Sequence, residues 1–420
     1  MFCAQPDTES GTQAGDRLSA ALPEEYTKSM DRLFAREFSV DYYGEDYTLI
    51  VIHSQFRYLL VEEGAEIPED LPEDVTILQK PFSHIYAASS SCPDFFRELH
   101  ALDLVTMTST KAEDWTIPAL REASEREDMI FVGKYSAPDY EYICDEGCDL
   151  AIENTMIYHA PEVSEMLTRL GIPVLTEYSS YEEEPLGRLE WIRLYGLLTD
   201  RQEEADAFFE EQIARINRVL EEEGAQTSGA DVVFFYISSN GTVNVRREND
   251  YVSRMIAMAG GRYLLHDLVE SLPASDSQSG SVALSMESFY DAAKDADILI
   301  YNGTLGESPE SVEDLIRRCP LLADFKAVKN KNVYCSRDSL FQEVTGTARM
   351  IEDFSHVISQ AGRESAGADE RKSEEDNPEN ERKTGEDNPE SKRKSEEDIP
   401  ESEQKGGEND EELTFLRKLR

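Results

Sequence analysis

The sequence predicts an α/β protein with two Rossmann-like lobes, joined by a single long α-helix and followed by a disordered C-terminal tail. Three observations lead to this prediction. A helical pattern runs through residues 186–224, short apolar runs alternate with helical segments on both sides of it, and an acidic repeat occupies much of residues 362–420. Strands that alternate with helices are typical of βαβ units on a largely parallel sheet.

The central helical segment is the predicted connection between the lobes. Thr199 and Gln202 have the spacing of a capping box. A helix of about two dozen residues spans roughly 35 Å, so it can join two lobes rigidly and restrict their motion. One buried face is indicated by apolar residues at three- and four-residue steps, namely Ala205, Phe208, Phe209, Ile213, Ile216 and Leu220.

Each lobe is predicted from its strand pattern. The first lobe, residues 37–183, begins with a β-hairpin in which the apolar runs 47–52 and 56–61 flank a short turn. The second lobe covers residues 230–361. The later strands are expected at 84–88, 104–107, 130–132, 150–152 and 173–175 in the first lobe, and at 232–237, 298–300 and 332–335 in the second.

The formal net charge of −46 is extreme. Such a field repels nucleic acids and anionic lipid headgroups, and it favours cationic ligands or basic partner surfaces. No apolar run approaches the roughly twenty residues of a membrane span. We therefore expect no nucleic-acid binding, and membrane contact only through a lipid anchor.

The first 30 residues are expected to form a flexible leader. Cys3 is followed by a polar stretch rich in Ser, Thr, Gly and Gln, which is how the tether of a bacterial lipoprotein reads after its lipidated cysteine. This interpretation predicts lipidation at Cys3 and a location on the outer face of the cell membrane or in the periplasm. The alternative is a frayed intracellular N-terminus with an incidental cysteine.

Motifs for catalysis are absent from the sequence. It contains no phosphate-binding or dinucleotide-binding glycine motif, no nucleophile elbow and no H-E-x-x-H. The six histidines are scattered, so we predict no metal site, no intrinsic cofactor and no enzyme activity. Two alternatives stay open: a metal site in which His84 and His159 approach each other across the sheet, and a disulfide between Cys144 and Cys148.

Polar and aromatic residues follow many of the predicted strands. Open parallel sheets bind ligands at this edge. Aromatic rings offer stacking area and Arg binds carboxylates bidentately, so the pattern suits a large, flat or anionic organic ligand. The candidate ligand-binding residues are Ser89, Ser90, Ser91, Trp115, Tyr135, Glu153, Asn154, Tyr178, Ser238, Asn240, Arg246, Arg247, Tyr301, Asn302 and Arg337.

The C-terminal tail differs in composition from the lobes. Residues 371–381, 382–392 and 393–403 are three copies of an eleven-residue unit that carries a proline and almost no apolar side chain. Such a segment buries too little surface to offset its ordering entropy, so residues 362–420 are predicted to be disordered. Residues 413–419 are apolar enough to dock weakly to a surface.

Several segments, in order, resemble the substrate-binding protein of bacterial ABC importers for iron-siderophore complexes, haem and cobalamin. The resemblance covers about residues 80–361. The matching segments are PFSHIYAAS at 81–89, CDLAI at 148–152, LGIPV at 170–174, LGRLEWI at 186–192, AGG at 259–261, DADILI at 295–300 and FKAVKNKNVY at 325–334.

The resemblance implies a class III periplasmic binding protein fold, a ligand bound between the lobes and no catalytic activity. A ferric siderophore, haem or cobalamin would be the ligand, and an ABC permease with its ATPase the partner of a monomeric binding protein. The family docks onto the permease through one acidic residue on each lobe. The first maps onto Asp94; the second maps onto Arg254, a reversed charge, so Glu248 or Asp250 is the expected substitute.

Two other functions are weighed against this one. The related α/β folds of nitrogenase-type proteins suggest a metal-cofactor enzyme, which would need clustered cysteines. The repeated tail suggests a surface adhesion or interaction protein, which would have a flat, charged surface between its lobes.

Overall fold

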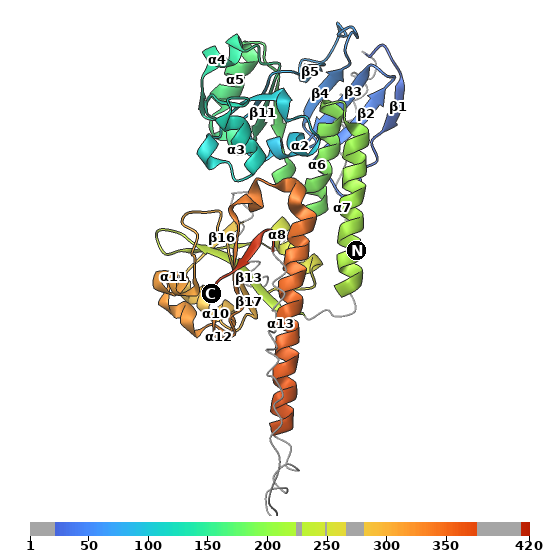
Figure 1. Cartoon of the computed structure of the whole chain (residues 1–420). Helices are drawn as coiled ribbons and strands as arrows, with labels where there is room; N and C mark the ends of the chain where they lie inside the picture. The colour runs from blue at the N-terminus through green and yellow to red at the C-terminus, as the bar shows by residue number, and fades with distance from the viewer. Residues whose placement is uncertain (1–21, 224–228, 248–249, 266–280, 376–412) are drawn as a thin grey trace, which may run out of the picture.

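The computed structural model of the chain describes residues 22–223, 229–247, 250–265, 281–375 and 413–420 (Figure 1). The predicted leader up to residue 21, with Cys3, lies outside the described residues, as does Glu248. Two lobes are stacked in Figure 1, and the long helices α7 (Gln202–Glu223) and α13 (Thr347–Glu375) run down one side of the lower lobe.

A five-stranded sheet precedes the first lobe's parallel sheet. The predicted hairpin is present as its strands β3 and β4, joined by a turn in which His53 and Ser54 have φ angles of 52° and 53°. The sheet around the hairpin has no counterpart in the strands predicted from the sequence. Its order is β1-β2-β3-β4-β5, with only β4 and β5 parallel. The strands are β1 (Tyr26–Ser29), β2 (Phe38–Tyr43), β3 (Tyr47–Ile52), β4 (Phe56–Val61) and β5 (Val75–Gln79).

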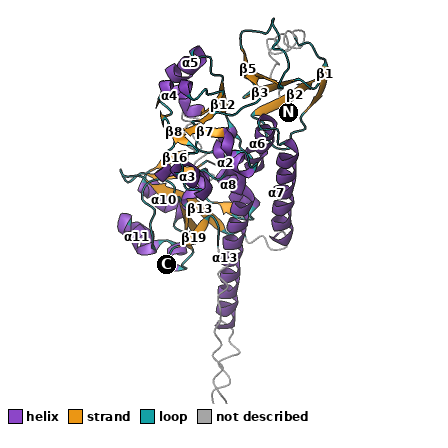
Figure 2. Cartoon of the chain, turned by 45° about the horizontal axis from the view of Figure 1, so that its top comes forward, coloured by secondary structure: helices purple, strands orange, loops and turns teal. Residues whose placement is uncertain are grey.

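The first lobe's central sheet is parallel throughout, in the order β12-β11-β6-β7-β8. Its central strand β6 is fully buried, and β11 is buried except for Asn154, because helices pack on both faces (Figure 2). The strands are β6 (Ile85–Ala87), β7 (Val105–Thr108), β8 (Ile130–Phe131), β11 (Leu150–Asn154) and β12 (Val174–Glu177). The helices are α2 (Cys92–Glu98), α3 (Pro118–Glu125), α4 (Tyr140–Asp145) and α5 (Pro161–Arg169), and a small ribbon is formed by β9 (Gly133–Lys134) and β10 (Ala137–Pro138).

The connection consists of two packed helices instead of one continuous helix. Helix α6 (Pro185–Leu198) ends at Thr199, and α7 begins three residues later after Asp200, whose φ is 57°. The predicted capping box is wrong, because the Thr199 hydroxyl donates a hydrogen bond to the Tyr195 carbonyl at 2.8 Å. Helix α7 alone then runs from the level of the first lobe down beside the second (Figure 1).

The second lobe has a mixed sheet in the order β16-β14-β13-β17-β18-β19, with β15 paired to β13. Strands β15, β13, β17 and β18 are parallel, whereas β14, β16 and β19 are antiparallel to their neighbours. The strands are β13 (Asp231–Ile237), β14 (Val243–Arg246), β15 (Arg262–Tyr263), β16 (Ser281–Leu284), β17 (Ile298–Tyr301), β18 (Val333–Ser336) and β19 (Leu416–Lys418); the other helices are α8 (Tyr251–Met258), α10 (Met286–Ala293), α11 (Val312–Arg318) and α12 (Lys326–Lys329).

The structure corrects the prediction of a disordered tail at both of its ends. Residues 362–375 continue α13, and residues 413–420 carry strand β19, which pairs with β18. The buried carboxylate of Asp353 on α13 accepts hydrogen bonds from the backbone N–H groups of Thr414, Phe415 and Leu416. The C-terminal segment is thus an integral edge of the second lobe, while residues 376–412, with most of the repeats, lie outside the described residues.

Candidate functional site

Two polar side chains meet at the carboxyl edge of the first lobe's sheet. Ser89 follows β6 and Glu177 ends β12, and only β11 separates these strands. The Ser89 hydroxyl donates to Glu177 Oε2 at 3.2 Å, and both residues are buried. Burial raises the pKa of Glu177, although the hydroxyls of Ser179 and Ser89 and the positive charge of Arg188 act in the opposite direction.

Arg188 connects this edge to the second lobe. It projects from α6, is only 6% exposed, and places its guanidinium carbon 4.5 Å from the ring centroid of Tyr251 on α8. Burial raises the pKa of both Glu177 and Asp250, and the positive charge of Arg188 opposes this shift in each case. The charge of one buried side chain therefore acts on carboxylates of both lobes.

Arg246 completes the second lobe's side of the site. Its guanidinium lies 5.0 Å from the ring centroid of Phe341 and forms an ion pair with Asp250 at 3.3 Å. Burial raises the pKa of Asp250, and the neighbouring Arg246 opposes this shift. Together these residues form what we call the interlobe cluster, which consists of Ser89, Glu177, Arg188, Arg246, Asp250 and Tyr251.

Ser89 and Arg246 of this cluster are candidates from the sequence, whereas Glu177, Arg188 and Tyr251 were not singled out as ligand-binding residues. Arg188 was assigned to the linker, and Tyr251 to an ordinary helix. One signal for Arg188 was present: it is a charged residue within the otherwise largely apolar stretch 185–198. Such a residue, once buried, needs a partner.

Glu153 is a second buried carboxyl at the same sheet edge. It is 0% exposed, and neither carboxylate oxygen has a hydrogen-bond partner within the described residues. Burial raises its pKa to about 8. At neutral pH this side chain is therefore largely protonated, so it would offer a ligand or a rearranged neighbour a hydrogen-bond donor.

The remaining candidates lie in other settings. Ser90 is exposed, Ser91 precedes α2, Tyr135 is half-buried beside the β9–β10 ribbon, and Arg247 accepts a hydrogen bond from Ser253 through its carbonyl. Two of them contact the interlobe cluster: the Ser91 hydroxyl lies 3.1 Å from the Ser89 hydroxyl, and the Arg247 carbonyl accepts a hydrogen bond from the Asp250 N–H at 3.2 Å.

Four more candidates are buried, as Ser89 and Glu153 are, and they take part in the packing or the turns of their own lobe. Trp115 is 0% exposed within the core, and Tyr301 packs edge-on against Phe235. Tyr178 is buried, stacks on His53 with centroids 4.5 Å apart and donates to the Tyr158 hydroxyl. Asn302 is also buried, and its side-chain oxygen caps the following turn at Thr304. An aromatic residue after a strand can complete the core as readily as it can line a site.

The other polar candidates have local structural roles. The Asn154 side chain accepts from the Met156 N–H, and Ser238 with Asn240 builds the turn between β13 and β14. Arg337 binds the returning C-terminal segment: its guanidinium donates to the Leu413 carbonyl at 3.2 Å and its N–H to the Phe415 carbonyl at 2.8 Å. These contacts give the four side chains structural partners within the chain.

Asp94, predicted to dock onto a permease, is instead buried between the lobes. It is 0% exposed, and its Oδ2 accepts hydrogen bonds from the N–H and hydroxyl of Thr345. The reversed charge at Arg254 has a similar explanation, because its guanidinium pairs with Glu184 at 2.8 Å and with Glu183 at 3.4 Å just before α6. Both positions contribute to contact between the lobes.

No cluster of three or more His, Cys, Asp or Glu residues suited to a metal ion occurs within the described ranges. In the same part of the chain Cys144 and Cys148 are both free thiols, and no helix is long and apolar enough to span a membrane.

Comparison with known proteins shows which family, relatives and solved structures the chain is similar to. Residues 96–340 match the profile of the family described as periplasmic binding protein. An uncharacterized lipoprotein of Methanocaldococcus jannaschii is 22% identical over 358 residues, which cover 79% of this chain and 81% of that protein.

Two solved structures share the fold. A protein of Staphylococcus epidermidis, described as a possible iron-binding (periplasmic solute-binding) protein, has a TM-score of 0.51 and 16% identity, and the match covers 66% of this chain and 99% of that one. The periplasmic heme-binding protein RhuT of Roseiflexus sp. RS-1 has a TM-score of 0.51 and 18% identity, with 67% and 100% covered.

Proposed function

Because the chain belongs to the periplasmic binding protein family, we propose that it is the solute-binding component of an ABC importer. The family and its structural neighbours bind solutes and are not enzymes, so the metal-cofactor enzyme is set aside. The proposed ligand is an iron-siderophore complex or a related large molecule such as haem or cobalamin, held between the lobes.

The observation that carries this proposal is the position of Arg188. It lies on the helix that begins the connection, and its charge acts on Glu177 of one lobe and Asp250 of the other. A ligand that carries anionic groups would compete with these carboxylates for Arg188 and Arg246. Such a ligand would therefore interact with charged groups of both lobes at the same time.

Delivery would be to a membrane permease and its ATPase, by a protein held at the outer face of the membrane or in the periplasm. The lipoprotein relative supports an anchored form, and Cys3 is the proposed lipidation site. We keep the chain as a monomer in this proposal. Asp94 would reach a permease only after the contact between the lobes opens, since its carboxylate is buried here.

Thermal unfolding with added ligand tests the proposal. A ligand at a hundredfold excess over its Kd adds about 2.7 kcal/mol of stability and so raises Tm. We expect a ferric siderophore, haem or cobalamin to raise Tm for the native chain and to lose most of this effect in Arg188→Ala.

Arg201→Ala is the matched control, because Arg201 is exposed at the start of α7 and outside the interlobe cluster. Its ligand response should equal that of the native chain. No Tm response to any of the three ligand classes would overturn the proposed cargo, and equal responses in both variants would remove Arg188 from the site.

A further inference from the structure

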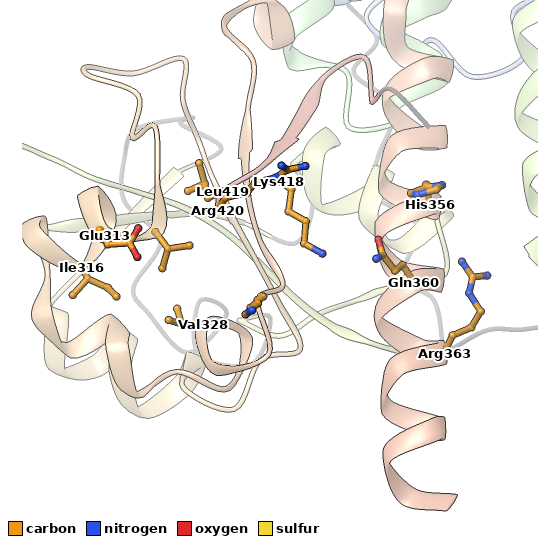
Figure 3. Close-up of a pocket in the computed structure, with 11 residues that line it drawn as sticks. Glu313, Ile316, Val328, His356, Gln360, Arg363, Lys418, Leu419 and Arg420 are labelled. Atoms are coloured by element: carbon orange, nitrogen blue, oxygen red, sulfur yellow. The ribbon is translucent and has the colours of Figure 1, made fainter. Parts of the chain in front are cut away.

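A cavity of about 930 Å³ opens in the second lobe, bounded by α11, α12, α13 and the returning strand β19 (Figure 3). None of its lining residues belongs to the interlobe cluster. Its volume falls in the range of roughly 300–1,000 Å³ that is usual for small-molecule sites.

One wall of the cavity is apolar. Val312 and Ile316 come from α11, Val328 from α12 and Leu419 from the end of the chain. Except for the buried Leu419, these side chains are half-buried. They offer a ligand apolar surface that water now covers in part.

The polar lining is mainly cationic. Lys331, Lys418 and Arg363 line the cavity, and none of the three forms an ion pair with a carboxylate among the residues that the structure describes. Lys418 extends from β19 toward Gln360 of α13 (Figure 3), and its ammonium lies 5.7 Å from the Tyr334 ring centroid. Glu313 is the one acidic side chain in the lining.

This concentration of positive charge contrasts with a chain whose net charge is −46. Lysines on such a surface would ordinarily find acidic partners, as Lys326 of α12 does with Asp297 at 2.6 Å. Lysines without a carboxylate partner among the described residues, next to an apolar wall, match the two ends of an amphipathic anion.

We propose that this cavity is a second binding site, for a small anionic amphipath that carries a carboxylate or phosphate head on an apolar body. The head lies between Lys331 and Lys418, and the body lies against Ile316 and Val328. The strand β19 supplies Lys418 and Leu419, so the site exists only when the C-terminal segment is in place.

Isothermal titration calorimetry of the full chain tests this site with octanoate and octyl phosphate as probes. The two probes distinguish a carboxylate from a phosphate head. Octyl glucoside has a similar apolar body without charge, and acetate has the charge without the body. We expect saturable binding of one equivalent of at least one octyl anion and much weaker binding of octyl glucoside and acetate.

The test variant is Lys331→Gln with Lys418→Gln, which removes both charges and keeps similar side-chain length. Its affinity for the octyl anion should fall by about tenfold or more. Lys329→Gln is the matched control, because Lys329 is on α12 but outside the cavity lining. Circular dichroism establishes that all variants are folded.

Three results would overturn the proposal: no saturable binding of either octyl anion, equal binding of octyl glucoside, or unchanged affinity in the folded double variant. Arg188→Ala should bind the probe as the native chain does. A negative titration with the octyl anions therefore does not affect the proposed function at the interlobe cluster. Likewise, the absence of a Tm response to a siderophore, haem or cobalamin does not affect the proposal of this second site.

Discussion

Asp94 and Thr345 join the two lobes through a buried carboxylate. Asp94 Oδ2 accepts from the Thr345 N–H and from its hydroxyl, each at 2.8 Å, while Arg97 donates to Asp94 Oδ1 and to the Thr345 hydroxyl. Nearby, Gln342 accepts from the Thr116 N–H and donates to the Asp114 carbonyl. The segment around residues 341–346 therefore binds the first lobe through a set of mutually satisfied polar groups.

Asp94→Ala should weaken this contact. It leaves the Thr345 N–H and the Arg97 guanidinium without their buried acceptor, which costs about 3 kcal/mol of unfolding free energy. Urea unfolding measures the loss, and small-angle scattering should show a larger radius of gyration as the lobes separate.

Asp103→Asn, an exposed acid in the same lobe, should change neither observable. If Asp94→Ala left both the unfolding free energy and the radius of gyration at native values, the contact would not hold the lobes together in solution.

Gly196 allows the close packing of α6 against α7. A Cβ at this position would lie 2.6 Å from the Ala205 Cβ and 2.9 Å from the Arg201 carbonyl oxygen. Gly196→Ala should therefore destabilise the protein by about 1–3 kcal/mol, although alanine favours helices over glycine. Chemical unfolding measures the change.

The comparison is Ala214→Gly on the exposed face of α7, where only helix propensity matters and the expected cost is about 1 kcal/mol. A stabilising Gly196→Ala would mean that the two helices do not pack as closely as described.

Much of the fold followed from periodicity. The strand patterns of both lobes and the apolar stripe of α7 report burial directly, because a strand or helix in a core must present apolar residues to it. The break between α6 and α7 was missed although residues 199–204 are all polar. The positive φ at Asp200 marks the turn between the two helices. Strand β19 was missed because a long polar repeat precedes it.

The candidate site was harder to predict. Position after a strand selected Ser89 and Arg246, which belong to the interlobe cluster, but it also selected Trp115 and Tyr301, which fill the core. Asp94 has the same residue type that docking requires, and nothing in its sequence neighbourhood reveals that Thr345, some 250 residues later, covers it. Contacts of this range are set by how the lobes meet and not by local pattern.

Glu153 should make stability depend on pH. Its folded-state pKa is raised from 4.5 to about 8 by burial. The stabilisation from the bound proton is therefore fully present below about pH 4.5 and is lost as pH rises through about 8. Relative to Glu153→Gln, the native chain should lose on the order of 3–5 kcal/mol of unfolding free energy between pH 4.5 and pH 9.

Urea unfolding of both proteins across this range measures the difference. Glu162 is an exposed carboxylate on α5. The unfolding free energy of Glu162→Gln should therefore change with pH in parallel with that of the native chain. Parallel curves for Glu153→Gln would show that Glu153 titrates near its ordinary value.

Phe415 should be a major source of stability in the second lobe, even though the repeats before it look unstructured in sequence. Its side chain is 0% exposed and packs beside Gly346, where an added Cβ would lie 2.3 Å from the ring. Phe415→Ala removes this packing and should cost about 3–5 kcal/mol. Thr414→Ala, at the adjacent exposed position, keeps the N–H that Asp353 binds and should cost far less.

Hydrogen exchange distinguishes a global loss of stability in Phe415→Ala from a local one. If β19 completes the lobe, Phe415→Ala should speed exchange at β18, whose residues Tyr334 to Ser336 pair with it, more than at β12 of the first lobe. Equal protection of β18 in the native chain and in Phe415→Ala would mean that the lobe is stable without its last strand. Because Lys418 and Leu419 line the cavity proposed as a second site, release of β19 should also abolish octyl-anion binding there.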